Sequence, residues 1–586
     1  MSTEETTQHP TPQDDSALTF EAPPSFPILE RIIAIWHSLK ITDRVIAAIF
    51  LALLCFAIFG IARDLNSRIT TEIPLNSGSL HEGVVGSPRF VNPVLAVSET
   101  DRSLTSLLYA GLTRAMSTGD IVPELAEKYS ISEDGKSYTF VIRTDARFHD
   151  NTPVTADDVI FTIQKILNPM IKSPRRADWE GVKIEKKDER TIVFNLEKPY
   201  APFLSNTTLG ILPKHAWNDL TDEEFVFSNK NIAAIGAGPY SFGEITYDTG
   251  GIPQQYTLHS FKKYSLGAPH IQTLYFSFFH NTEELTSAWD SRTIDTQSGP
   301  APERIQSLIH QKTILESAIL PRVFGIFLNE TRNPILADVV VRKALRTAVN
   351  QKDILETVLH GFAVPLTGPL PNLILESATD SNVEALAEAN KLLTDAGWIL
   401  DEATHTRTKD DKILSISLAT ANNDELKAIA QKISESWQTI GVSVKVELFE
   451  TGDLNQTVLR PRAFDALLFG EVTGREPDLF AFWHSSQKND PGLNIAQYSN
   501  KKADSELERA RTTGDAEEKN ALYASFTKRL REDIPAIFIY APQYIYIHQY
   551  TDPHATLAPI MEPYERFSDV HTWYVESERV WNFFAS

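Results

Sequence analysis

Residues 123–163 decide the fold, and they read PELAEKYSISEDGKSYTFVIRTDARFHDNTPVTADDVIFTI. The triplet EDG (133–135) predicts a hairpin turn, and YTFVIR (138–143) is the strand that follows it. The triplet NTP (151–153) then turns the chain toward a helix that begins near Thr155. These elements form a small α+β unit, and nothing in the unit has catalytic chemistry.

Outward from this unit, strand-like and helical runs alternate along the chain, and no fixed-period repeat is visible. Further strands are predicted at 191–196, 273–279, 323–329, 413–419, 442–449 and 536–542. Helices are predicted at 155–167, 338–350, 383–396, 424–440 and 503–530, several of them opened by Asp or Thr at a cap position. The mixture predicts α/β architecture, and 586 residues suggest about two to four domains.

The order of elements and residues in 123–163 resembles the signature of the family 5 periplasmic solute-binding proteins, whose members bind oligopeptides, dipeptides, nickel complexes or some oligosaccharides. The family usually has Gly where this chain has Asn151, and Asn also tolerates positive φ. Further stretches agree in order and in approximate spacing. They are SPR (87–89), NP (92–93), DRSLTSLLYAGL (101–112), APFLS (201–205), LPKHAW (212–217), GAGPY (236–240), VFGIFLN (323–329), VRKALRTAVNQKDI (341–354), LLTDAGW (392–398), FDALLFG (464–470) and DIPAIFIY (533–540). The resemblance covers nearly everything from residue 80 onward.

This resemblance implies an α/β, periplasmic-binding-protein-like fold of class II, with three lobes and a hinge between lobes, preceded by one transmembrane helix. Lobe I would comprise 80–112, 211–324 and 541–586, lobe II would be inserted at 113–210, and lobe III would cover 325–540. We expect the ligand to lie between lobes I and III, which close on it. The aromatic stretch 540–550 is predicted to form buried strands at a hinge crossing. The family also implies a monomer that serves the permease subunits of an ABC transporter.

In family members that bind peptides, the ligand backbone pairs in β fashion with the loop before the first helix and with an edge in the third lobe. The matching ligand-binding positions are Ser98, Glu99 and Thr100 on one side and Phe469, Gly470, Glu471, Val472 and Thr473 on the other. Because main-chain pairing is indifferent to side chains, such a site would accept many peptide sequences. The alternative is that these are ordinary loop and strand-end residues.

Members that anchor a free amine carry an Asp a few residues before the Pro that corresponds to Pro477, where charge-assisted hydrogen bonds hold the peptide's ammonium. Here the segment between Gly470 and Pro477 reads EVTGRE, which is one residue shorter and contains no Asp. Glu471 or Glu476 could substitute, with Glu471 the better placed, and Arg475 could neutralise either. The recognition of a free amine is therefore left open by the sequence.

The N-terminal region contains VIAAIFLALLCFAIFGIA (45–62), eighteen residues without a charge, which predicts a transmembrane helix or an uncleaved signal anchor. Residues 1–44 are predicted to form a disordered acidic tail and a juxtamembrane segment, and 63–79 a polar linker. The alternatives are a buried core helix, a signal peptide cleaved after the small residues Gly60 and Ala62, and a lipoprotein anchored at Cys55. The flanking cations give a faint positive-inside bias, and we expect a single-pass protein of the cell membrane with its large domain extracytoplasmic.

Composition and motifs exclude several classes of function. The formal charge of -22 repels a phosphate backbone, and no basic stripe with interleaved aromatics offsets it, so no nucleic acid partner is expected. Cys55 is the only cysteine, which leaves no intrachain disulfide and no cysteine-based metal cluster. The sequence has no G-x-S-x-G, H-E-x-x-H or G-x-x-x-x-G-K motif. We therefore predict neither an enzyme nor a protein with a cofactor or metal site.

The sequence as a whole predicts a membrane-anchored receptor that captures oligopeptides or peptide-like solutes for an ABC transporter. One alternative is an anchored sensor or scaffold without a transporter, whose acidic tail would contact a partner. The other is a binder of a non-peptide solute such as an oligosaccharide or a metal chelate. No motif in the sequence separates these three functions.

Overall fold

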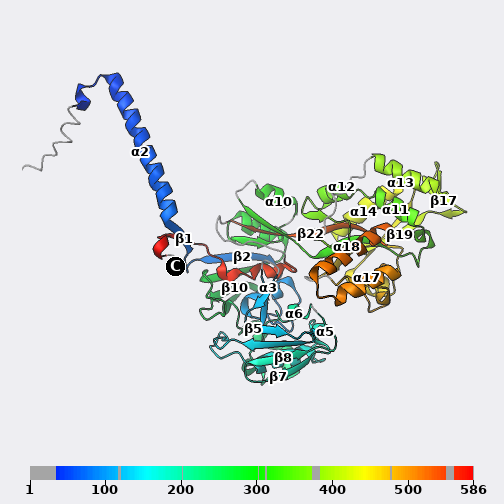
Figure 1. Ribbon diagram of the computed structural model, residues 1–586, viewed down its shortest axis with the longest axis horizontal. Helices are drawn as coiled ribbons and strands as arrows, with labels where there is room; N and C mark the ends of the chain where they lie inside the picture. The colour runs from blue at the N-terminus through cyan, green and yellow to red at the C-terminus, as the bar shows by residue number, and fades with distance from the viewer. Residues whose placement is uncertain are drawn as a thin grey trace, which may run out of the picture. The chain divides into compact units, whose positions relative to one another are not determined.

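The structure, a computed structural model shown in Figure 1, describes residues 35–116, 120–200, 202–300, 302–309, 313–371, 383–474, 478–549 and 560–584. It divides into two compact units. The first contains the N-terminal residues up to Ile73 together with Glu578–Ser586, and the second is Pro74–Ser577. The first 34 residues of the predicted acidic tail lie outside the described residues.

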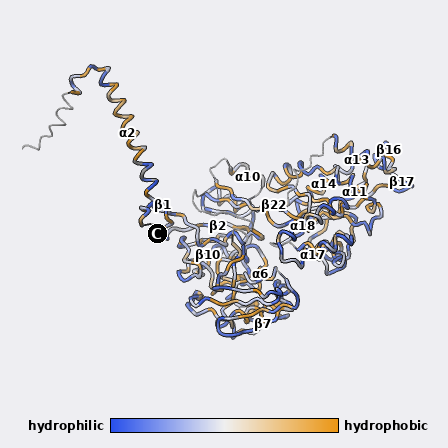
Figure 2. Tube along the Cα trace, viewed as in Figure 1, coloured by the Kyte–Doolittle hydropathy of each residue, from blue (hydrophilic) through white to orange (hydrophobic). Residues whose placement is uncertain are grey.

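The first unit is built on one long helix, α2 (Ile41–Ile69), which contains the apolar run predicted at 45–62. Ile41–Ile61 is long and apolar enough to cross a membrane, and none of this span is buried, which disfavours a core helix. Figure 2 shows hydrophobic residues over most of α2 and hydrophilic residues at the end that leads into β1. Strand β1 (Thr70–Pro74) follows directly and pairs with β23 (Ser577–Trp581), after which η8 (Asn582–Phe584) follows.

The second unit contains a 12-stranded sheet. In spatial order its strands are β20 (Ser443–Phe449), β19 (Ser415–Ala421), β21 (Ala466–Val472), β14 (Arg322–Leu328), β22 (Ala536–His548), β12 (Thr296–Ser298), β2 (Ser79–Val85), β11 (Thr273–Phe279), β10 (Pro253–Ser260) and β9 (Tyr240–Tyr247), with β13 (Ile314–Ile319) and β15 (Ala363–Pro365) also paired to β22. Apolar residues at every second position explain why such segments form strands with one buried face. In β11, Leu274, Phe276 and Phe278 are buried, and the residues between them are partly exposed.

Strand β22 takes part in two different cores. Its first part pairs antiparallel with β14, where Phe327 lies opposite Ala536, and residues 536–541 belong to a hydrophobic core drawn from 323–541. Its second part pairs with β13, where Ile319 lies opposite Gln543. Tyr544 and Tyr546 belong to a second core, which also contains residues between 80 and 320 and between 560 and 573. The predicted strand 536–542 therefore continues to His548, because β13 and β12 supply further antiparallel partners.

The stretch 123–163 forms the unit predicted for it. Strands β5 (Ala126–Ile131) and β6 (Ser137–Ile142) make an antiparallel hairpin, and Gly135 in its turn has a φ of 65°. Asn151 has a φ of 70°, so it takes the left-handed conformation expected of the family's glycine. Helix α4 (Ala156–Leu167) begins after Thr155, whose backbone N–H and hydroxyl both donate to the Asp158 carboxylate.

The remaining elements complete the second unit. Strands β7 (Lys183–Lys186) and β8 (Thr191–Asn195) extend the β5–β6 hairpin to four strands, and small sheets are formed by β3 (Thr113–Ala115) with β4 (Ile121–Pro123) and by β16 (Ile399–Asp401), β17 (Thr406–Lys409) and β18 (Lys412–Ile413). The described helices are α3 (Glu99–Leu108), α5 (Arg176–Trp179), α6 (Phe203–Asn206), α7 (Lys214–Trp217), α8 (Asp222–Phe227), α9 (Thr282–Asp290), α10 (Pro302–Ile309), α11 (Val339–Ala348), α12 (Gln351–Asp353), α13 (Val383–Asp395), α14 (Asp424–Thr439), α15 (Thr451–Asp453), α16 (Leu479–Trp483), α17 (Lys501–Thr512) and α18 (Ala516–Asp533).

Two further predicted elements are wrong in extent. The helix predicted at 503–530 is two helices, because α17 ends at Thr512 and the Asp515 carboxylate accepts from the first N–H groups of a new helix, α18. The strand predicted at 413–419 is also divided. Ile413 ends β18, which pairs with β17, and β19 starts only at Ser415.

Candidate functional site

The first predicted binding segment, 98–100, lies at the start of helix α3. Ser98 is the N-cap, and its hydroxyl accepts from the N–H of Asp101 at 3.0 Å. The Asp101 carboxylate accepts in return from the N–H of Ser98 and also from the N–H groups of Arg89 and Phe90. One carboxylate therefore fixes both the start of the helix and the loop that precedes it.

Glu99 is exposed, and two neighbouring strands hold its carboxylate in place. Ser298 in β12 donates its hydroxyl to Glu99 at 2.9 Å, and Tyr544 in β22 donates to Ser298 at 3.0 Å. The next residue, Thr100, is buried, and its hydroxyl donates to the carbonyl of Val85. The Glu99 side chain is thus accessible to a ligand, and that of Thr100 is not.

Close to Glu99 lies a buried ion pair between Arg566 and Glu82, whose side chains have no exposed surface. Arg566 donates to one Glu82 oxygen at 2.8 and 3.1 Å, and the hydroxyls of Thr296 and Tyr546 donate to the other oxygen. The same guanidinium lies 3.9 Å from the Glu99 carboxylate. Buried charges persist only when they are paired in this way, so the cluster ties β2, β12 and β22 to the start of α3.

The second predicted segment, 469–473, begins in the last part of β21. On one side, β14 pairs with it from Gly325 opposite Phe469 to Arg322 opposite Val472. On the other side, β19 pairs with β21 only as far as Leu467. Among the residues that the structure describes, no strand covers this second edge from 469 to 472. An uncovered edge offers backbone donors and acceptors to another extended chain.

Glu471 is the most unusual residue of this edge. Only 6% of it is exposed, and its Oε1 atom has no hydrogen-bond partner within the described part of the chain. Burial raises the pKa of the Glu471 carboxyl well above its usual range, and the charge of Arg462 opposes this shift only in part. Arg462 donates its own hydrogen bonds to the carbonyls of Leu459, Lys488 and Gly492. Among the described residues, nothing donates to Glu471 Oε1, and the charge of Arg462 compensates the burial of the carboxyl only in part.

The flanking residues of the edge differ in accessibility. Val472 is 49% exposed, whereas Thr473 is buried. Both the N–H and the hydroxyl of Thr473 donate to the carbonyl of Pro321, so this residue closes the strand end. Phe469 and Gly470 are half-buried. Phe469, Gly470 and Val472 are thus the accessible residues of the edge, and Thr473 is its structural end.

Gly470 allows an aromatic ring to lie against the strand. A Cβ atom at Gly470 would lie 2.6 Å from the ring of Phe324, so a larger side chain would displace that ring. Phe324 stacks on Tyr540 of β22 with the ring centroids 4.6 Å apart. The Tyr540 hydroxyl donates to the Glu425 carboxylate at 2.5 Å. This stack connects the β21 edge to β22.

Strand β22 carries the supports of both predicted segments. Tyr540 packs behind the β21 edge, and Tyr544 holds Glu99 through Ser298. The two tyrosines are four residues apart in one strand, so they lie about 13 Å apart and point to the same face. A short length of β22 therefore brings the two segments into one region of the molecule.

Salt bridges make a second connection between the same parts of the chain. Arg322, which lies opposite Val472 in the sheet, pairs with Glu562 at 3.1 Å. Glu562 in turn lies 3.9 Å from Arg102 of α3. These side chains are partly exposed, so the pairs are weak individually and act mainly as positional contacts.

Comparison with known proteins places this geometry in a family. The sequence model described as bacterial extracellular solute-binding proteins, family 5 middle, matches residues 120–494. The chain belongs to this family. The predicted periplasmic-binding-protein-like α/β fold of a family 5 solute-binding protein is thereby confirmed.

Individual relatives of this solute-binding protein support the assignment. The oligopeptide-binding protein AppA of Bacillus subtilis (strain 168) is 28% identical over 482 residues, which cover 80% of this chain and 87% of AppA. The solved structure of AppA from Bacillus subtilis in complex with a nonapeptide has a TM-score of 0.64 at 25% identity and covers 86% of this chain and 100% of that chain. The structure of NikZ from Campylobacter jejuni in complex with Ni(L-His) has a TM-score of 0.65 at 25% identity, with the same coverage.

The predicted site residues of this solute-binding protein fall into two groups. Ser98, Glu99, Phe469, Gly470 and Val472 are exposed or half-buried, and Thr100, Glu471 and Thr473 are buried. Their role in ligand binding stays a prediction. Arg475, Glu476 and Pro477 lie outside the described residues, so only Glu471 of the two candidate anchors has a described environment.

The residues that bond to or pack against the predicted site were not predicted from the sequence. They are Glu82, Ser298, Phe324, Tyr544 and Arg566. Glu82 and Arg566 are 484 positions apart, so no local pattern could have paired them. The tyrosines could have been found from the sequence. Tyr540, Tyr544 and Tyr546 occur at even spacing in β22, and this spacing places residues on the same face of a regular strand.

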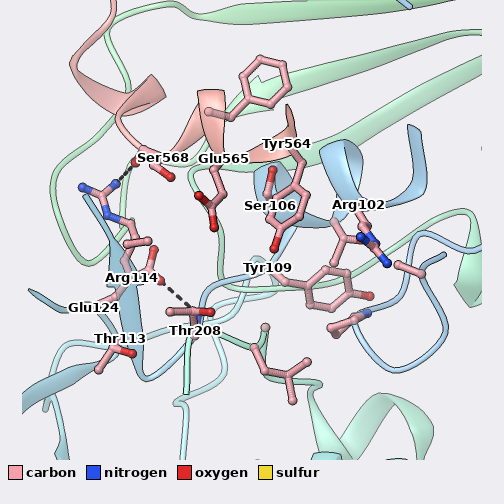
Figure 3. A pocket seen from close by; sticks show the side chains of 18 of the residues that line it. Arg102, Ser106, Tyr109, Thr113, Arg114, Glu124, Thr208, Tyr564, Glu565 and Ser568 are labelled. Atoms are coloured by element: carbon pink, nitrogen blue, oxygen red, sulfur yellow. Dashed lines mark hydrogen bonds between the residues drawn. The ribbon is translucent and has the colours of Figure 1, made fainter. Parts of the chain in front are cut away.

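The solute-binding protein also has a cavity of about 140 Å³ beside α3, shown in Figure 3. Arg102, Ser106 and Tyr109 line it on one side, and Tyr564 and Glu565 line it on another. The Tyr109 hydroxyl is buried and has no hydrogen-bond partner among the described residues. None of the eight predicted binding residues lines this cavity, so it is separate from the predicted site.

Proposed function

We propose that this protein captures oligopeptides between lobes I and III for an ABC transporter, that it is anchored to the membrane by α2 with its large domain extracytoplasmic, and that it has no catalytic activity. The observation that carries the proposal is the edge of β21 at 469–472, which no described strand covers, with the buried Glu471 carboxyl in it, whose Oε1 atom has no hydrogen-bond partner among the described residues.

The uncovered edge would bind the ligand through its backbone. An extended peptide that pairs with 469–472 adds a strand to the large sheet, and this uses only main-chain donors and acceptors. Peptides of many sequences would then bind with similar geometry. The printed names of relatives agree with this chemistry, since AppA of Bacillus subtilis is an oligopeptide-binding protein and a 25% identical protein of Escherichia coli (strain K12) is a dipeptide-binding protein.

Glu471 would hold the ammonium at the start of the peptide. Burial favours the neutral form of the Glu471 carboxyl, and an arriving cation favours its ionised form. Charge-assisted hydrogen bonds from an ammonium would compensate the desolvation that Glu471 suffers in the free protein. The amine anchor would then lie within strand β21.

Glu99 would receive the ligand on the opposite side. Its carboxylate is exposed, and Ser298 and Arg566 fix it in place. The supporting Tyr540 and Tyr544 are about 13 Å apart along β22, which equals about four residues of an extended chain. A peptide of about four residues is therefore the shortest that would contact both sides.

The three-lobe division and closure about a hinge belong to the same proposal. The separate hydrophobic cores on the two parts of β22 support a division near residues 325 and 541, and β22 would act as the hinge strand. Ligand binding would shift the protein toward a closed state only to the extent that the ligand binds the closed state more tightly than the open state. We propose further that the protein is a monomer and that the permease subunits recognise the closed form.

Thermal unfolding of the full-length protein in lipid nanodiscs tests the proposal. A peptide library that runs from dipeptides to decapeptides should raise the Tm, with a clear increase from tetrapeptides onward, because a ligand that binds only the folded state stabilises it. An oligosaccharide panel and nickel–histidine chelates serve as comparison ligands. The proposed ligand class is wrong if one of these raises the Tm and no peptide does.

A further inference from the structure

The cavity beside α3 has polar side chains on two sides. Arg102, Thr105 and Ser106 line it from α3, and Tyr109, the C-cap residue of this helix, continues the same side. Arg114 of β3 lines it from the opposite side, as Figure 3 shows. A cavity of about 150 Å³ can hold benzene, so a volume of about 140 Å³ has room for a molecule of comparable size.

Several buried donors at this cavity are unused. The hydroxyl oxygens of Thr105 and Tyr109 and the Nε atom of Arg114 are buried and have no hydrogen-bond partner in the part of the chain that the structure describes. Tyr109 is 3% exposed, and burial raises the pKa of its hydroxyl above the usual range, so the hydroxyl keeps its proton. Buried polar groups in folded proteins almost always have a partner, and where the protein supplies none the partner is water, an ion or a ligand.

The guanidinium groups that line the cavity differ in how well their charges are compensated. Arg114 and Arg175 each pair with an aspartate, at 3.0 and 2.9 Å. Arg102 pairs only with Glu562 among the described residues, at 3.9 Å, and the same Glu562 carboxylate lies closer to Arg322, at 3.1 Å. The charge of Arg102 is therefore the least compensated of the three.

The carboxyl groups that line the cavity already accept hydrogen bonds from the protein. One Glu124 oxygen accepts from the N–H of Gly111 at 3.0 Å, and the other accepts from the Tyr264 hydroxyl. Burial raises the pKa of Glu124, which favours its neutral form. Glu565 accepts from the N–H of Met561 at 2.8 Å. The unused capacity of the cavity thus consists of donors and one cation, and a molecule that fits it is an anion rich in acceptors.

We propose that this cavity is a second binding site, which takes a small organic carboxylate of about six to eight non-hydrogen atoms. The carboxylate pairs with the planar guanidinium of Arg102, and further acceptors of the ligand receive the hydroxyls of Thr105 and Tyr109. Water alone would leave the charge of Arg102 without an anion. The hydrocarbon part of the ligand has apolar neighbours, which an inorganic anion would not use. These neighbours are Pro93, Ala96, Leu209, Pro239 and Phe567.

Isothermal titration calorimetry with the full-length protein in lipid nanodiscs tests this site independently of peptide binding. Succinate and butyrate are the probes, and succinamide and butyramide are uncharged controls with the same numbers of non-hydrogen atoms. Inorganic phosphate is the third anion. Arg102→Met removes the guanidinium from the cavity. Arg332→Met is the matched control, because Arg332 also has a long ion pair, 4.0 Å from Asp465, and does not line the cavity. Tyr109→Phe removes only the buried hydroxyl.

At least one carboxylate should bind at a single site, and neither amide should bind. Arg102→Met should lower the affinity roughly 10- to 150-fold, which corresponds to one lost charge-assisted hydrogen bond, and Arg332→Met should bind like the wild type. Tyr109→Phe should also weaken binding, yet the ligand-free variant should keep or exceed the wild-type Tm, because it no longer buries an unsatisfied hydroxyl.

The proposed site is wrong if neither carboxylate binds, if the amides bind as tightly as the acids, or if phosphate is the only anion that binds. It is also wrong if Arg102→Met and Arg332→Met have equal affinities for the carboxylate. None of these results depends on whether peptides bind at β21, so the capture of peptides is tested separately.

Discussion

Glu471→Gln should separate peptides with a free amine from peptides without one. The substitution keeps the shape of the side chain and removes the charge of a carboxyl that is 6% exposed. In the ligand-free protein the change should be tolerated, because the Oε1 atom has no hydrogen-bond partner among the described residues that would be lost. In the complex the substitution removes the proposed counter-charge of the peptide's ammonium.

The size of the effect follows from the contact that is lost. A hydrogen bond to a charged group contributes about 1.5–3 kcal/mol, and 1.4 kcal/mol corresponds to about a tenfold change in Kd. The affinity of Glu471→Gln for a free-amine tetrapeptide should therefore be roughly 10- to 150-fold lower than that of the wild type. The N-acetylated form of the same peptide has no ammonium, so its affinity should be nearly equal for the two proteins.

Isothermal titration calorimetry at neutral pH with this pair of peptides measures the difference. Glu402→Gln provides the control, because it removes one carboxylate from an exposed position of the same unit. Equal affinities of wild type and Glu471→Gln for the free-amine peptide would refute the anchor. An equal loss for both peptides would also refute it, because the substitution would then act on the shape of the edge and not on the ammonium.

Three further predictions concern stability. Arg566→Met leaves the Glu82 carboxylate buried without its partner and should lower the free energy of unfolding by about 3–5 kcal/mol in denaturant titrations, whereas the double replacement of Arg566 and Glu82 by Met should be less harmful than the single one. Gly236→Ala should prevent stable folding, because its Cβ would lie 1.9 Å from a backbone carbonyl oxygen, while Gly452→Ala, with open space around it, should keep nearly the wild-type Tm. Because burial raises the pKa of Glu471, the folded state keeps a proton that the unfolded state releases, so the free energy of unfolding of the wild type should fall as the pH rises above about 4.3 toward the raised pKa. Glu471→Gln should lack this loss, and parallel slopes for the two proteins over that range would contradict the assignment.

Local chemistry made much of the fold predictable. The turn at 133–135 and the cap at Thr155 depend on residues within a few positions of one another, and the structure has both. The family resemblance matches Asn151 to a glycine, and Asn151 has the positive φ that Asn tolerates at such a position. The error at 503–530 has a local cause too. Helical periodicity continues through α17 and α18, and the cap at Asp515 between them was overlooked.

The candidate site was predictable only in outline. The family resemblance predicts ligand contacts at 98–100 and 469–473, but the accessibility of these residues depends on tertiary packing that no sequence pattern encodes. Thr473 is buried because it bonds to Pro321, which precedes it by 152 positions. The open edge of β21 likewise depends on where β19 stops pairing with it, and this is a property of the assembled sheet.

Because β22 contributes side chains to two hydrophobic cores, the protein should not divide into fragments that fold independently. Its first residues complete one hydrophobic core and its last residues complete another, so a cut within the strand removes side chains from at least one core. Residues from Pro74 to Ser577 should therefore melt in a single calorimetric transition, and fragments separated within this strand should be recovered as aggregates unless they are expressed together. Recombination between relatives is limited in the same way. If one lobe were exchanged together with β22, the new strand would fit the core of the exchanged lobe and not the core of the other lobe. Evolution should therefore exchange the whole unit and not single lobes.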